Sequence, residues 1–412
     1  MVRIKDSLVS MSGVVTAQVL LFLSIVLLGR ERGPEILGQF NGSVALGTLV
    51  GTLLALRYEL ACLSDRSEVS FEALIHVLAL GAAIATAVAA VLLAYGRHHL
   101  LLVELYAVAT FMFNLAAAYL NSLKRYGLIA LARIAVNVGL LVCVASPFRG
   151  WLKAEPFFAY TIVNTVIGLL ALTATLCNGW SKGYRVTFDP KFYSVNSRFA
   201  AYILPATVLG SVMTYALAIA VPSWYGAKEA GYFAVAYRLG FSPVSLVGQS
   251  IGGVFRRDAL GAVRTNTDGS ELVQVYRTYA RGLIAVSLIY AFLAFVLFEP
   301  VVALFLGAKW EGATPFFYFL IPLFSVQILY VPLSQVFLAV RKQKLDFLFQ
   351  MWSGSVLIAT LYATHVLNLS AVVSVAIFSI VGAIVTVWGV TVTARAASSR
   401  TSGYRAVLDC LI

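Results

Sequence analysis

Four charged side chains stand inside stretches of sequence that are otherwise apolar. Arg57, Arg133 and Arg238 are basic and Glu59 is acidic. A charged residue at the centre of a membrane helix costs about 2.5–3.5 kcal/mol on insertion scales, so such residues are candidates for a functional site. With three arginines against one glutamate, a cavity lined by these side chains has a positive potential and favours an anionic ligand. We therefore take all four as candidate substrate-binding residues.

The stretch that carries Arg238 has two further polar features. Pro243 removes a backbone hydrogen bond, so we expect a kink near the membrane midplane, which suits a gate. Gln249 continues the polar line and is a fifth candidate substrate-binding residue. The surrounding residues 248–252 (GQSIG) fit a hydrolase nucleophile pattern, which requires a strand, a sharp turn and a helix. Here the pattern lies in a helical span, which favours close helix packing through small residues.

Three of the four charges also have a structural explanation. Arg57 and Glu59 are two residues apart, and on a helix such residues point to nearly opposite sides, so we do not expect them to pair with each other. Arg57 can instead extend to the cytoplasmic headgroups. Glu59 and Arg133 are at similar depths and can form an ion pair between helices. These explanations stay open beside the binding role.

Other kinds of chemistry find no support in the sequence. It contains no H-E-x-x-H, no C-x-x-C and no Walker A motif, which argues against a zinc enzyme and against an ATP-driven pump. The four cysteines are scattered, with no paired spacing. We expect no metal site and no cofactor, and we expect the chain not to be an enzyme.

The composition indicates a polytopic membrane protein. The 412 residues are 60% hydrophobic and 12% charged, with a mean hydropathy of +0.89, whereas soluble proteins have about 25% charged residues. The first apolar stretch, residues 8–28, lacks a small-residue cleavage site, so we expect it to remain as an anchor.

Twelve stretches are long and apolar enough to be spanning helices, each of which needs about 20 residues. We predict an all-α fold in which these spans form two six-helix bundles, related by a pseudo-two-fold axis along the membrane normal. The predicted spans are residues 9–28, 41–61, 73–94, 100–121, 127–146, 156–177, 199–221, 231–254, 282–304, 314–338, 346–366 and 370–393.

The predicted domains follow from the long loop at residues 178–198. They are an N-terminal bundle (1–180), a cytoplasmic linker (181–198), a C-terminal bundle (199–394) and a cytoplasmic tail (395–412). LGQF at 37–40 and AGYF at 230–233 open the second span of each half, which supports a duplication.

The basic residues indicate the orientation. Of 30 lysines and arginines, 20 lie on the side that holds both termini, 7 on the opposite side and 3 within spans. The positive-inside rule therefore places both termini in the cytoplasm. Because topology accounts for the net charge of +12, we expect no nucleic-acid partner.

Four stretches in order along the chain resemble one family of transporters. They are KDSLVSMSGVVTAQVL at the N-terminus, GPEILGQF with LRYELA, GYFAVAYRLGFSPVSLVGQSIGGVFRRDA, and LGAKWEGATPFFYFLIPLFSVQILYVPLSQVFLAVRKQKLDFLFQ. They are similar to Wzx-type polysaccharide flippases, the O-antigen and exopolysaccharide translocases of the multidrug/oligosaccharidyl-lipid/polysaccharide exporter superfamily. Residues 63–67 depart from the family pattern because they lack a Leu-Pro turn.

The resemblance implies two bundles that face each other in a V around a cationic cavity. It implies alternating-access transport of an undecaprenyl-pyrophosphate-linked oligosaccharide from the cytoplasmic to the periplasmic leaflet of a bacterial inner membrane. Polymerase and glycosyltransferases of the same pathway are the implied partners. Arg57 and Glu59 match LRYELA, and Arg238, Pro243 and Gln249 match the AYR…P…GQ pattern.

The side chains suit this substrate. A pyrophosphate carries about two negative charges, which planar guanidinium groups bind in bidentate fashion. Tyr58, Tyr237 and Tyr290 are candidates for aromatic contacts with sugars.

Two other functions stay open. A cation-coupled multidrug exporter of the same superfamily needs a cavity lined by carboxylates, for which Glu59 is the one strong candidate. A membrane-embedded polysaccharide polymerase usually needs a large outer loop, whereas the longest predicted outer loops, 29–40 and 222–230, have about a dozen residues or fewer.

Overall fold

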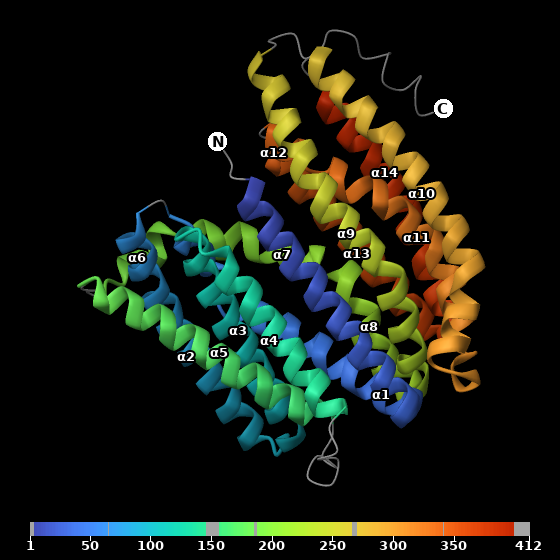
Figure 1. Ribbon diagram of the computed structural model, residues 1–412, viewed down its shortest axis with the longest axis horizontal. Helices are drawn as coiled ribbons and strands as arrows, with labels where there is room; N and C mark the ends of the chain where they lie inside the picture. Colours follow the sequence, from blue (N-terminus) through green and yellow to red (C-terminus); the bar gives the residue numbers. More distant parts are fainter. Residues whose placement is uncertain are drawn as a thin grey trace. The chain divides into compact units, whose positions relative to one another are not determined.

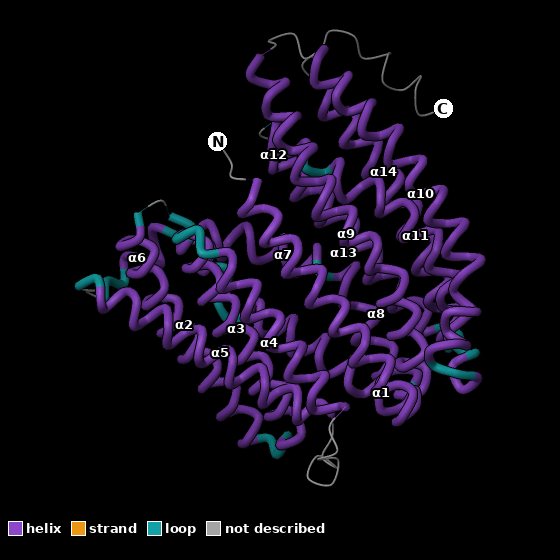
Figure 2. Tube along the Cα trace, in the orientation of Figure 1, coloured by secondary structure: helices purple, strands orange, loops and turns teal. Residues whose placement is uncertain are grey.

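The protein is helical throughout the part of the chain that its computed structural model describes. That part comprises residues 4–64, 66–145, 156–184, 188–265, 270–340 and 342–398. Figures 1 and 2 show helices and connecting loops in these ranges and no strands, as the all-α prediction requires. The chain forms two compact units, Met1–Ser211 and Val212–Ile412. The predicted linker boundaries at 181 and 198 stay a prediction.

The first unit opens with a long helix, α1 (Ile4–Leu53), that breaks once at Gly33. Gly33 has a φ of 79°, which favours glycine, and Pro34 follows it. The two arms of α1 overlap the first two predicted spans, although the second arm ends at Leu53 and not at residue 61. The unit continues through η1 (Tyr58–Cys62), α2 (Ser67–Ala94), η2 (His98–Leu100), α3 (Leu101–Ser122), α4 (Tyr126–Ala145), α5 (Pro156–Ser181), α6 (Lys191–Val195), the π-helical turn η4 (Phe199–Ile203) and α7 (Leu204–Gly210).

Helix α3 is the centre of the first unit, where it packs against α1, α2 and α5. Gly47 and Gly51 let α1 approach α3 closely. A Cβ on Gly51 would lie 2.5 Å from the Ala107 carbonyl oxygen, and one on Gly47 would lie 2.5 Å from the Tyr106 ring. The small-residue spacing in this span therefore serves helix packing.

The second unit is built around α11 (Ala313–Leu333), which packs against α9, α10 and α14. Gly248 of the GQSIG stretch faces this helix, because a Cβ there would lie 2.7 Å from Val331 Cγ1. The Ser250 hydroxyl donates to the Leu246 carbonyl at 2.6 Å, inside a continuous helix and not at a strand-to-helix turn. The other elements are α8 (Val212–Tyr225), α9 (Ala227–Thr265), α10 (Ser270–Phe305), η5 (Ala308–Trp310), α12 (Val336–Ala339), α13 (Gln343–Val366) and α14 (Ala371–Ser398).

Helices α9 and α10 are far longer than a bilayer requires, with 39 and 36 residues. At about 1.5 Å per residue they measure roughly 55 Å, against a hydrocarbon core of about 30 Å. The Tyr279 hydroxyl of α10 donates to Asp258 Oδ2 of α9 at 2.6 Å. This bond links the two helices near the ends that extend beyond their apolar runs.

The protein is a multi-pass membrane protein. Eight helices within the described ranges are long and apolar enough to span a membrane, or nine if residues 199–210 and 215–225 count as one span. The two arms of α1 and helix α9 lie outside this group, and α9 carries Arg238 within its apolar run. The arrangement of twelve spans in two related bundles stays a prediction.

The contact of Gly51 with α3 predicts that Gly51→Ala destabilises the first unit. The added methyl meets a backbone oxygen that cannot rotate away, so we expect a loss of about 1–3 kcal/mol in the free energy of unfolding. Gly253→Ala is the matched control, because a Cβ at this helical glycine meets nothing within 4 Å. Thermal unfolding of the purified variants should show a lower midpoint for Gly51→Ala alone; equal midpoints would contradict the packing role.

Candidate functional site

The candidate site begins at the end of helix α1. This helix ends earlier in the chain than the sequence predicts. The predicted span continues to residue 61, but α1 stops at Leu53. Leu56 and Arg57 then have φ values of 45° and 64°, a left-handed conformation that is uncommon outside glycine. The chain resumes as the 3₁₀ helix η1, which starts at Tyr58. The prediction of a continuous helix through Glu59 is therefore wrong.

This turn is held by the core of the first unit. Ala55, Tyr58 and Cys62 belong to one buried cluster with Phe71 of α2 and Leu115 of α3. Two consecutive left-handed residues store about 1–3 kcal/mol of strain each, which the surrounding packing must offset. Strain of this kind is concentrated at functional sites.

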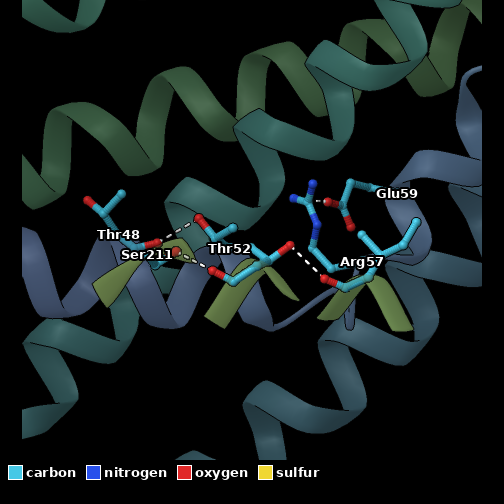
Figure 3. A network of polar contacts seen from close by, with 7 residues as sticks. Thr48, Thr52, Arg57, Glu59 and Ser211 are labelled. Atoms are coloured by element: carbon cyan, nitrogen blue, oxygen red, sulfur yellow. Dashed lines mark hydrogen bonds and ion pairs between the residues drawn. The ribbon is translucent and has the colours of Figure 1, made fainter. Parts of the chain in front are cut away.

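The turn brings Arg57 and Glu59 together. Arg57 Nη1 lies 2.7 Å from Glu59 Oε1, and the two side chains are 23% and 10% exposed. Figure 3 shows the guanidinium and the carboxylate pointing toward each other, beyond Thr48 and Thr52 at the end of α1. The expectation that the two residues point apart is wrong, because it assumed a helix through both. The distance is that of a short, charge-assisted hydrogen bond.

Glu59 does not pair with Arg133, contrary to the other expectation from the sequence. Arg133 lies on α4 with an exposed side chain. Among the described residues, no carboxylate is recorded within ion-pair distance of Arg133, and the carboxylate of Glu59 is recorded with Arg57 only. The actual pair lies within one turn and not between two helices.

The Arg57–Glu59 pair leaves hydrogen-bonding capacity unused. Arg57 Nε and Glu59 Oε2 are buried, and neither has a hydrogen-bond partner among the described residues. A buried polar atom without a partner costs about 1–3 kcal/mol, so a ligand or water that supplies the missing partner is favoured. The free guanidinium edge suits an oxyanion, because an arginine offers five N–H donors in a planar fork.

Arg238 and Pro243 belong to the second unit. Helix α9 runs through both, and the side chain of Arg238 is half-buried. The Ser242 hydroxyl donates to the Arg238 carbonyl at 2.7 Å, and the Tyr290 hydroxyl donates to the Gly240 carbonyl at 2.9 Å. Pro243 has no N–H to donate to the Leu239 carbonyl, four residues earlier in the helix. The two hydroxyls bond the carbonyls on either side of that position. The gating role of Pro243 stays a prediction.

The remaining residues predicted from the sequence have mixed outcomes. The side chain of Gln249 lies outside the described residues, and its binding role stays a prediction. Tyr58 is only 7% exposed and packs against Phe192 and Tyr193, so its ring faces protein and not a sugar. Tyr290 uses its hydroxyl on Gly240.

Sequence reasoning missed the contacts of the segment at residues 188–195 with α2. His76 is fully buried there and stacks on Phe188 and Phe192 at centroid distances of 4.9 and 4.7 Å. The one available signal was the aromatic content of FDPKFY, which is high for a polar loop. Tyr193 lies outside the predicted spans. Burial raises the pKa of its hydroxyl, and the nearby Tyr58 is a second cause.

The burial of the Arg57–Glu59 pair predicts an asymmetry between two variants. Arg57→Met should lower the free energy of unfolding by about 3–5 kcal/mol, because it leaves a buried carboxylate unpaired. The double variant Arg57→Met/Glu59→Gln removes that charge and should recover most of the loss. Thermal unfolding in detergent measures both, and a double variant no more stable than the single one would contradict the pairing.

The chain has relatives in sequence and in fold. Residues 157–315 match the model of the family described as polysaccharide biosynthesis protein. The comparison with curated proteins gives no match.

Three solved structures illustrate the fold. The structure described as "Lipid II flippase MurJ, inward closed conformation" is similar over 93% of this chain and 87% of its own, with a TM-score of 0.75 and 14% identity. The MATE multidrug transporter DinF-BH gives 0.64, with 14% identity and 94% of each chain covered. A MOP superfamily transporter from Pyrococcus furiosus gives 0.61, with 13% identity and coverage of 97% of this chain and 95% of its own.

These findings confirm the resemblance that the four sequence stretches indicate. At 13–14% identity, the structural matches establish the fold. Residues 157–315 are therefore similar to the family of polysaccharide biosynthesis proteins, and the chain as a whole shares its fold with these three solved structures.

Proposed function

We propose that this protein is a flippase for a lipid-linked oligosaccharide. Its substrate is an undecaprenyl-pyrophosphate-linked oligosaccharide, which it moves from the cytoplasmic to the periplasmic leaflet for exopolysaccharide or O-antigen assembly. The observation that carries the proposal is the Arg57–Glu59 pair, with a buried Nε and a buried Oε2 that lack partners among the described residues. The family match and the MOP fold support the same function.

In this proposal Glu59 holds Arg57 until a diphosphate arrives. The pair is neutral as a unit, so it can lie buried without the field of a bare cation. A diphosphate offers oxygens to the same fork of N–H donors and competes with the Glu59 carboxylate for Arg57. Arg133 and Arg238 supply further positive charge for an anion of about two charges. Gln249 contributes an amide to the binding cavity, and Pro243 allows α9 to bend.

The proposed orientation places both termini in the cytoplasm of a bacterium, with twelve spans in two bundles that work by alternating access. The excess of basic residues on the side of the termini supports this orientation. With the cytoplasm negative, outward movement of two negative charges across 100 mV releases about 4–5 kcal/mol. Polymerase and glycosyltransferases of the same pathway are the proposed partners.

A multidrug exporter is the second candidate function. The similarity in fold to the multidrug transporter DinF-BH favours it. Against it, the charge of the Glu59 carboxylate is balanced by Arg57, 2.7 Å away at Oε1. A polymerase gains no support, because residues 29–40, the longest predicted outer loop, are helical within α1.

The fork geometry of Arg57 predicts that Arg57→Lys impairs transport. Lysine keeps the charge beside Glu59 but cannot bind a phosphate in bidentate fashion. Loss of one charge-assisted hydrogen bond of about 1.5–3 kcal/mol corresponds to about a 10- to 100-fold lower flipping rate. The assay is flipping of a fluorescent polyprenyl-diphosphate oligosaccharide in proteoliposomes.

Arg257→Lys is the matched control for this assay. Arg257 is 68% exposed at its side chain and lies 3.3 Å from Asp258 of the same helix. We expect wild-type flipping from this variant. Equal rates for Arg57→Lys and wild type would contradict the proposed site, and efflux of cationic dyes by the wild type would favour the exporter.

The half-buried position of Arg238 predicts that Arg238→Ala stops polymer from reaching the cell surface while the protein level in the membrane stays normal. The physical reason is the loss of one of three deep positive charges. Lys228→Ala removes the same charge from the first turn of α9 and should leave surface polymer unchanged. Surface polymer is measured by sugar-specific staining, and normal staining with Arg238→Ala would count against the site.

A further inference from the structure

The segment at residues 188–195, here called the linker segment, is attached to α2 through His76. The Asp189 N–H donates to His76 Nε2 at 3.0 Å, and His76 Nδ1 lies 2.9 Å from the Glu72 carbonyl oxygen. Because that carbonyl can only accept, Nδ1 carries the proton and Nε2 is the acceptor. The buried imidazole therefore holds the linker segment through Nε2, while Nδ1 is fixed by a carbonyl of its own helix α2.

Tyr58 contacts the same segment. Its hydroxyl donates to the Tyr193 carbonyl at 3.3 Å, and its ring meets Tyr193 edge-on at 5.6 Å between centroids. The Tyr193 hydroxyl in turn donates to the His76 carbonyl at 2.9 Å. A chain of contacts therefore runs from Tyr58 through Tyr193 to His76.

The position of Tyr58 in the sequence links these contacts to the Arg57–Glu59 pair. Tyr58 lies between the two members of the Arg57–Glu59 pair, at the first residue of η1. The linker segment continues through residues 199–211 into the second unit, which starts at Val212. Tyr58 thus connects the ion-paired turn with the stretch of chain that leads from one unit to the other.

The turn is strained, and this makes the connection sensitive to the ion pair. Leu56 and Arg57 adopt left-handed conformations, which persist only where surrounding interactions hold them. The Arg57–Glu59 bond spans Tyr58, so release of that bond removes one restraint on the conformation of this residue. A peptide plane is rigid, so any change of φ or ψ at Arg57 moves the Tyr58 side chain.

We propose that Tyr58 is a positioning residue that couples the state of the Arg57–Glu59 pair to the linker segment, with Tyr193 and His76 as the receiving contacts. The inference rests on the proposed function, in which a diphosphate competes with Glu59 for Arg57. Binding of the anion then loosens the linker segment on α2, and the loosened segment permits the change between inward and outward states.

Hydrogen exchange of the full-length protein in lipid nanodiscs tests the coupling without any ligand. Glu59→Gln weakens the pair, and Tyr58→Phe removes the bond to Tyr193 but keeps the ring. Each variant should raise the exchange rate of the amides at residues 189–196 by about 2- to 10-fold, the effect of one hydrogen bond. In the double variant the effect of Glu59→Gln should vanish, because Tyr58 transmits it.

Tyr184→Phe is the matched control. The Tyr184 hydroxyl lies 2.6 Å from Ser67 Oγ at the start of α2, whereas that of Tyr58 bonds the Tyr193 carbonyl. In this background Glu59→Gln should keep its full effect on residues 189–196. The coupling is overturned if Glu59→Gln leaves these amides unchanged, or if its effect persists undiminished in Tyr58→Phe.

Flipping by the same variants separates this inference from the proposed function. Tyr58→Phe should lower the maximal flipping rate several-fold, while the affinity for inorganic pyrophosphate stays within about twofold of the wild-type value. Loss of folding would lower both the rate and the affinity. A wild-type protein that flips no lipid-linked diphosphate overturns the proposed function. If the wild type flips the lipid but the effects of Glu59→Gln and Tyr58→Phe on hydrogen exchange simply add in the double variant, the coupling alone is overturned.

Discussion

The early end of α1 is the constraint on which the candidate site depends. If the helix continued past Leu53, Arg57 and Glu59 would point apart, and each charge would need a separate partner. The left-handed turn at Leu56 and Arg57 places the two side chains 2.7 Å apart. Insertion of Tyr58 and Cys62 into the core between α2 and α3 holds that turn. The apolar packing of the first unit thus determines the electrostatics of the site.

Each unit repeats one packing solution around a central helix. Helices α3 and α11 correspond to the fourth and the tenth predicted spans, the same position in each half. Glycines let a neighbouring helix approach each of them, Gly51 against α3 and Gly248 against α11. Such contacts replace the hydrophobic effect, which does not drive association between helices within lipid. The chemistry can therefore differ between the units while the framework stays the same.

The sequence predicted the helices well and the site only in part. Runs of apolar residues define α3 and α4 to within a residue or two, because a spanning helix must satisfy its own backbone. The turn at 54–57 carries no glycine or proline, so no local signal marks it. Tertiary burial of Tyr58 imposes it instead. The contact of His76 with Asp189 joins residues 113 apart, a distance at which sequence patterns carry no information.

The unequal lengths of the helices have a consequence for how each of them responds to lipid. Helix α10 has 36 residues and α9 has 39, whereas α4 has 20, which at about 1.5 Å per residue measures only about 30 Å. A thicker bilayer can draw another turn of the long helices into its core. Over its described residues, helix α4 has no additional turn to supply, so it must reduce its tilt or thin the bilayer around it. Hydrophobic mismatch therefore acts more strongly on a short helix such as α4 than on α9 or α10.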